Sequence, residues 1–98
     1  MNFKEKYPSL AYLLKCYFNQ DFDVLFGNAD KTLTAYQSTE IAEEQLQLKS
    51  EIERLLALSL SDNELQNILL NEIDCNYYYP NDWPSAEEWL RHICKQIK

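Results

Sequence analysis

Glycine is almost absent from this sequence, because Gly27 is the only one in 98 residues and there are only three prolines. A β-sheet domain of this length changes direction many times and needs turn residues at regular intervals. This chain cannot supply them. Its hydrophobic fraction of 46% is nevertheless enough to build a core, which argues against a disordered chain. The sequence therefore predicts an all-α fold: a compact single-domain bundle over residues 1–98, with about five to seven helices, some of them short.

Four stripes of apolar residues recur at the spacing of one helical face. The first stripe follows Pro8, a residue that suits a first helical turn. Each stripe predicts a helix that packs onto a common core. The four stripes are Leu10, Leu13, Leu14, Tyr17 and Phe18; Ile41, Leu48, Ile52, Leu55 and Leu56; Leu65, Ile68, Leu69 and Ile73; and Ala86, Trp89, Leu90, Ile93, Cys94 and Ile97.

Capping residues predict where the helices begin. Ser61 and Ser85 are each followed three residues later by a glutamate, which is the pattern of a capping box. Asp21 and Asp30 are expected to cap two short helices, and the long helix is expected to start at Ser38. The single glycine is expected to end the short helix that follows Asp21.

The chain is strongly acidic, with sixteen Asp and Glu against nine Lys and Arg and a formal net charge of -7. Such a surface repels nucleic acid and anionic lipid and favours basic partners, although simple solubility is an alternative explanation. We therefore expect no direct binding to nucleic acid or to membranes. Five glutamates are expected on the solvated face of the long helix. They are Glu40, Glu43, Glu44, Glu51 and Glu53.

The sequence offers little for catalysis, a metal or a cofactor. His92 is the only histidine, and its spacing from the apolar stripe predicts that its side chain lies on the exposed side of the last helix. The pair Asp21 and Asp23 lacks the alternating oxygen ligands and the closing glutamate of a calcium loop. One glycine cannot form a phosphate-binding loop. No catalytic residue, metal ligand or cofactor is therefore predicted.

Cysteine usage and hydropathy indicate the compartment. The three cysteines form no CxxC pair, so we expect reduced, partly buried thiols rather than disulfides. The chain starts without an apolar signal-peptide core, and its apolar runs are too short to span a bilayer. The expected location is the cytoplasm.

Aromatic residues are concentrated in DCNYYYPNDWP, residues 74–84. In an extended segment neighbouring side chains alternate between two sides, so at least one of Tyr77, Tyr78 and Tyr79 is expected to face solvent. Tyrosine and tryptophan are enriched in interface hot spots because they bring large contact area at small entropic cost. A mixed role is therefore expected, with some rings closing the bundle and others available to a partner.

Three segments resemble the helical immunity proteins of bacterial contact-dependent growth inhibition systems. YPSLAYLLKCYFNQDFDVLFG is similar to their opening, which has Tyr-Pro-x-Leu and then an apolar helix closing in Tyr-Phe-x-Gln-Asp-Trp. IERLLALSLSDNEL is similar to the segment before the family's Glu-Leu helix, and WPSAEEWLRHICKQI resembles its closing helix. Phe22 stands where the family usually has tryptophan.

The resemblance implies a cytoplasmic antitoxin, not an enzyme. Such a protein would bind, one to one, the C-terminal toxin domain of a cognate effector and block its active site or substrate cleft. The toxins are often nucleases, and an RNase is the first expectation here. A nuclease needs a basic cleft to hold phosphates, and an acidic partner is complementary to such a cleft. The alternative is a helical adaptor that binds a peptide or partner helix through an apolar groove, with little dependence on salt.

The residues expected to contact the partner lie outside the motif shared by the family. Tyr17, Phe18, Gln20 and Asp21 belong to that motif and are expected to build the scaffold. Glu40, Glu43 and Glu44 are further candidates for contact. The six predicted contact residues are Asp23, Asp30, Asp74, Tyr77, Tyr78 and Asp82.

Overall fold

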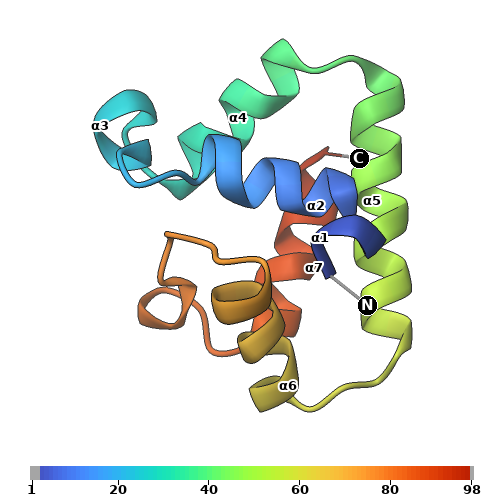
Figure 1. Cartoon of the computed structure of the whole chain (residues 1–98). Coiled ribbons are helices and arrows are strands. Elements are labelled where there is room, and N and C mark those ends of the chain that lie inside the picture. Colours follow the sequence, from blue (N-terminus) through green and yellow to red (C-terminus); the bar gives the residue numbers. More distant parts are fainter. Residues whose placement is uncertain (1–2, 98) are drawn as a thin grey trace.

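Helices α5 (Ala42–Ala57) and α7 (Ala86–Ile97) pack against each other and form the frame of the fold. The computed structural model describes residues 3–97, and Figure 1 shows α5 along one edge with the other elements on the side where α7 lies. Helix α2 (Pro8–Tyr12) packs on α5, while α4 (Ala29–Thr39) and α6 (Asp62–Asn67) pack on α7. The predicted all-α fold is confirmed, with seven α-helices and no strand within the described range.

Shorter elements complete the path of the chain. Two helices continue without a break into wider π-helical turns, which form where a residue's N–H bonds five residues back. The remaining elements are α1 (Phe3–Lys6), the π-turn η1 (Leu13–Tyr17), α3 (Phe22–Phe26), the π-turn η2 (Ile68–Glu72) and the 3₁₀ turn η3 (Tyr79–Asn81).

The predicted apolar stripes form the core with one clear exception. Almost all of their members are buried around Trp89, which is fully buried at the centre. Ile41 is 67% exposed, because α4 runs on through Thr39 and the long helix begins only at Ala42. The predicted start at Ser38 is therefore wrong. Ile41 lies in extended backbone before the helix, so its side chain does not share the face of the helical stripe.

Glu51 is a second correction, because this glutamate is buried instead of lying on the solvated face of α5. Its Oε1 accepts the backbone N–H of Leu10 at 2.9 Å, and its Oε2 accepts a hydrogen bond from Gln47 at 2.9 Å. Position 51 lies three residues after Leu48 and four before Leu55, which places it on the apolar stripe itself. The carboxylate thus joins α5 to the first turn of α2.

Both predicted serines cap their helices, and Ser61 does so in the complete capping box that the sequence predicted. Ser61 Oγ accepts the N–H of Glu64 at 3.2 Å, and Glu64 Oε1 accepts the N–H of Ser61 at 3.0 Å, which completes a capping box. Ser85 Oγ accepts the N–H of Glu88 at 3.2 Å. These bonds satisfy backbone donors that have no partner within their own helices.

The aspartate caps were predicted less well. Asn28, not Asp30, caps α4, because its Oδ1 accepts the N–H of Lys31 at 2.9 Å. Asp21 occupies the N-cap position of α3 as expected, but its side chain makes no capping hydrogen bond. Gly27 ends α3 as predicted, with a φ of 106° that side chains rarely allow.

Candidate functional site

The aromatic segment 74–84 runs beside α7 and alternates between core and solvent. Tyr77 and Tyr79 are buried, whereas Tyr78 between them is 54% exposed. The predicted exposure of at least one tyrosine is therefore confirmed. Tyr79 stacks on Trp89 with 5.0 Å between ring centroids, which holds the middle of the segment on the core.

Tyr77 anchors the segment and positions Asp82. Its ring packs against Phe18 at 5.4 Å and against Phe22 of α3 at 5.3 Å, while its hydroxyl donates to Asp82 Oδ2 at 2.6 Å. Burial raises the pKa of this hydroxyl well above its usual range, and the bond to Asp82 raises the pKa further. The hydroxyl therefore remains a donor at neutral pH. With 7% of its surface exposed, Tyr77 holds the site together more than it offers contact area.

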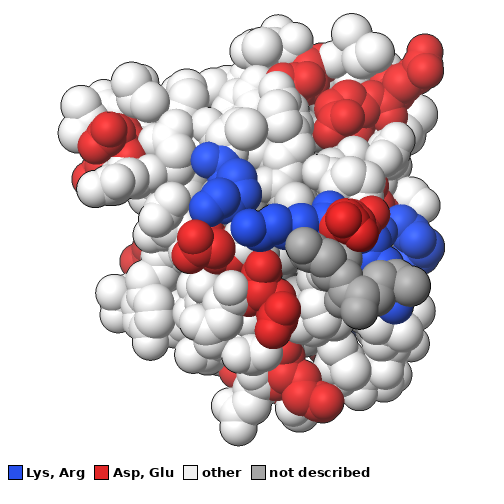
Figure 2. All heavy atoms as spheres, viewed as in Figure 1, with Lys and Arg blue, Asp and Glu red and all other residues white. Residues whose placement is uncertain are grey.

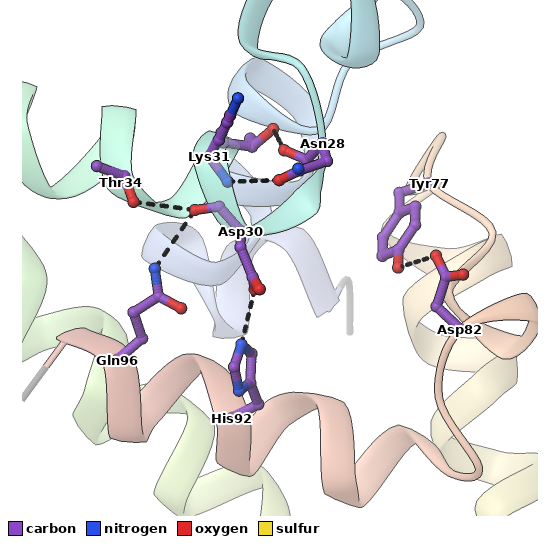
Figure 3. Close-up of polar contacts among 9 residues, drawn as sticks. Asn28, Asp30, Lys31, Thr34, Tyr77, Asp82, His92 and Gln96 are labelled. Atoms are coloured by element: carbon purple, nitrogen blue, oxygen red, sulfur yellow. Dashed lines mark hydrogen bonds and ion pairs between the residues drawn. The ribbon is translucent and has the colours of Figure 1, made fainter.

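Asp30 is fixed by a contact between α4 and α7. Figure 3 shows its carboxylate directed at His92, with 2.8 Å between Asp30 Oδ1 and His92 Nε2. The backbone carbonyl of Asp30 accepts hydrogen bonds from Thr34 and Gln96. Because a carboxylate accepts, the bond to the imidazole needs a proton on Nε2. His92 is thus half-buried and engaged, not simply solvated as the sequence predicted.

A pocket of about 200 Å³ lies between the beginning of α4 and the aromatic segment. It brings together three of the six predicted contact residues, namely Asp30, Tyr77 and Asp82. Trp83 also lines the pocket and lies 4.7 Å from the His92 ring between centroids. The full lining is Asn28, Ala29, Asp30, Tyr77, Asp82 and Trp83.

The other three predicted contact residues do not line this pocket. Asp23 lies on α3, where its Oδ1 accepts the N–H of Val24 at 3.0 Å and the rest of the carboxylate faces solvent. Asp74 pairs with Lys15 at 3.1 Å, so its charge is largely balanced within the chain. Tyr78 faces solvent on the aromatic segment. In Figure 1, α3 and the aromatic segment lie on the same side of the molecule.

The further candidates Glu40 and Glu44 lie at a different place, the corner between α4 and α5. Glu40 Oε2 accepts the hydroxyls of Tyr12 at 2.7 Å and Tyr17 at 2.6 Å, and Glu44 accepts from Tyr36 at 3.2 Å. The bonds from Tyr17 and Tyr12 lower the pKa of the Glu40 carboxyl. Figure 2 shows acidic side chains over this corner and, separately, over α3, while Lys and Arg form a band across the middle of the same face.

Two neighbours of the pocket and one exposed pair were not predicted from the sequence. His92 and Trp83 join Asp30 from positions more than fifty residues away, and local pattern carries no signal for such a contact. Val24 and Leu25 of α3, whose sequence pattern carried no prediction of exposure, are strongly exposed.

Among residues 3–97, no group of three or more His, Cys, Asp or Glu side chains is arranged to hold a metal ion. No helix in that range has the length and apolar character needed to cross a membrane.

The chain is thus a small all-α domain with an acidic surface and an aromatic segment that packs on its core. Comparison with known proteins gives the family. The model of the CdiI immunity protein family matches residues 6–97, so the chain belongs to that family. One chain in the crystal structure of a CdiA-CT/CdiI complex from Y. kristensenii 33638 is 70% identical. The match covers 99% of this chain and 98% of that one, with a TM-score of 0.96. No curated protein sequence gives a significant match.

Proposed function

We propose that this chain binds the C-terminal toxin domain of a cognate CdiA effector in the cytoplasm, one to one, and keeps that domain inactive. The observation that carries the proposal is the 70% identity, over nearly the whole chain, to a chain found in a CdiA-CT/CdiI complex. The match of residues 6–97 to the immunity family supports the same function. No catalysis by this chain is part of the proposal.

The proposed target is a nuclease, in the first place an RNase. A nuclease holds phosphates with basic residues, so an acidic protein can compete with nucleic acid for the same cleft. This chain has a net charge of -7, and Asp23, Asp30 and Asp82 are exposed on elements at one side of the fold. The proposed mode of inhibition is occlusion of the toxin's active site or substrate cleft.

The contact surface that we propose combines fixed and free groups. His92 holds Asp30, and Tyr77 holds Asp82, so these two carboxylates are oriented before the partner arrives. Such preorganisation reduces the entropy that binding must otherwise lose. Asp23 and Tyr78 are exposed and available for direct contact. Asp74 is expected to contribute less, because Lys15 already balances its charge.

The test uses the toxin domain encoded by the reading frame adjacent to the gene for this chain. Isothermal titration at low and at moderate salt is expected to give tight one-to-one binding that weakens as salt rises. RNase and DNase assays of the toxin domain, with and without this chain, test the nuclease and its inhibition. Absence of binding at both salt concentrations would overturn the proposal. Tight binding to a toxin domain without nuclease activity would support the proposed immunity function and refute only the proposal that the toxin is a nuclease.

A matched pair of variants tests steering by the surface. Asp23→Asn and Glu53→Gln remove the same charge, one from α3 and the other from the exposed side of α5. Asp23→Asn is expected to slow association, and more strongly at low salt, because screening weakens the attraction at high salt. Glu53→Gln is expected to change little. Equal effects of both variants would mean that only net charge matters, and salt-insensitive binding would favour the apolar-groove adaptor instead.

A further inference from the structure

Two neighbouring aliphatic side chains of α3 lie in water. Val24 is 82% exposed and Leu25 is 61% exposed. The inner side of α3 is supplied by Phe22 and Phe26, which pack against the core. Figure 1 shows α3 extending from the rest of the molecule. Val24 keeps most of its contact with water when the chain folds and Leu25 keeps more than half, so the hydrophobic effect gives them only a small role in stability.

The segment that carries them is held at both ends. Phe22 packs against Phe18 with 5.5 Å between ring centroids and against Tyr77 at 5.3 Å, while Phe26 stacks on Tyr17 at 6.0 Å. Helix α3 also packs on α4. Val24 and Leu25 therefore lie on a helix whose two ends pack against the core. The helix loses little conformational entropy when a partner covers it.

Exposed carboxylates lie at the N-terminal side of the exposed pair. Asp21 and Asp23 are both exposed and precede the pair, whereas the side chain of Lys31 lies beside Gly27 at the other end of α3. Figure 2 shows the acidic side chains of this end of the molecule among uncharged ones. An apolar centre with carboxylates at its edge is complementary to an apolar recess bordered by Lys or Arg. Such a recess is compatible with a basic toxin domain and incompatible with an acidic one.

We infer that α3 is an anchor for the toxin domain, in which Val24 and Leu25 enter an apolar recess beside basic residues of the CdiA C-terminal domain. This inference rests on the proposed function and names the part of the surface that carries most of the affinity. Interface energy is concentrated in a few side chains that become fully desolvated, whereas charges at the rim act mainly on rate and specificity. The anchor therefore acts on dissociation, and the carboxylates act on association.

The chain contains a closely matched control for the test. Leu46 on α5 is 60% exposed, so Leu46→Ala removes the same atoms from an equally exposed leucine outside α3. Binding of the adjacent-frame toxin domain is measured for the wild type, Leu25→Ala, Val24→Ala and Leu46→Ala. Leu25→Ala is expected to raise Kd by about tenfold or more, mainly through faster dissociation and to the same extent at low and moderate salt. Leu46→Ala is expected to leave Kd within about twofold.

Further measurements separate the possible outcomes. Melting temperatures of these variants are expected to equal that of the wild type, and Leu25→Met, which keeps the apolar volume, is expected to retain most of the affinity. If the wild type binds and Leu25→Ala binds as tightly as Leu46→Ala, the anchor is overturned while the immunity function stands. If the wild type does not bind, the proposed function fails first. Self-association of the chain alone that Leu25→Ala abolishes would assign α3 to a second copy and overturn the anchor.

Discussion

Replacing Glu51 should destabilise the fold far more than replacing any exposed glutamate. Leu10 is the third residue of α2, and its N–H is one of the donors that a helix leaves without an internal partner. Tyr7, at the N-cap position, makes no capping hydrogen bond with its side chain. Glu51 therefore caps α2 from another helix, at 2.9 Å and with 1% of its own surface exposed.

The expected magnitude follows from what each substitution leaves behind. Glu51→Ala leaves the N–H of the fully buried Leu10 without an acceptor and removes a negative charge from the beginning of α2. Together these losses lower the free energy of unfolding by about 2–3 kcal/mol, or the melting temperature by roughly 10 °C or more. Glu51→Gln keeps an oxygen acceptor and the volume, so its cost should be about 1 kcal/mol or less.

Urea unfolding followed by far-ultraviolet circular dichroism measures these differences. Glu53→Ala is the control, because Glu53 is exposed on the same helix and its loss should change stability by no more than about 0.5 kcal/mol. The reasoning is refuted if Glu51→Ala and Glu53→Ala unfold at the same urea concentration. If Glu51→Gln is as destabilised as Glu51→Ala, the stability of α2 depends on the negative charge of Glu51 and not on the presence of a hydrogen-bond acceptor at position 51.

Two further predictions concern titratable groups. Hydrogen bonds from Tyr17 and Tyr12 lower the pKa of the Glu40 carboxyl from its ordinary value of 4.5. The ionised carboxylate therefore stabilises the fold at pH values above 4.5. This stabilisation is lost as the pH falls through the lowered pKa of the folded state. The melting temperature of Glu40→Gln should therefore lie below that of the wild type at neutral pH and approach it in acid; a constant difference would contradict this linkage. Burial raises the pKa of the Cys75 thiol to about 12, whereas Cys16 is exposed. A thiol reagent should modify Cys16 quickly in the native protein and Cys75 only in denaturant, and rapid native modification of Cys75 in a Cys16→Ser variant would show that the segment opens.

The separation between scaffold and surface that the sequence suggested is partly visible in the structure. Tyr17 and Phe18, from the motif shared with the family, are buried and form aromatic contacts with α3 and the aromatic segment. Asp21 from the same motif is exposed and begins α3 through its backbone carbonyl, which accepts the N–H groups of Val24 and Leu25, but its side chain makes no cap. A shared motif is therefore not buried throughout.

The sequence by itself determined the features that depend on residues a few positions apart. The all-α class and the helix that begins after Ser61 follow from a period of 3.6 residues and from a cap three residues away. The exposure of Tyr78 follows equally from alternation along an extended segment. Each of these interactions is local, so the pattern contains all of the information needed.

Only the tertiary structure decided which groups meet across the bundle. The Glu51 side chain accepts a hydrogen bond from the backbone of Leu10, 41 positions away, and Asp30 pairs with His92, 62 positions away. Periodicity places a residue on a face of its own helix, but it does not say which element covers that face or which unpaired donor that element brings. Glu51 was therefore assigned to solvent although it lay on the buried stripe. The exposure of Val24 and Leu25 was likewise decided by the tertiary structure. Helix α4 and the aromatic segment cover the side of α3 that carries Phe22 and Phe26, and they leave Val24 and Leu25 uncovered.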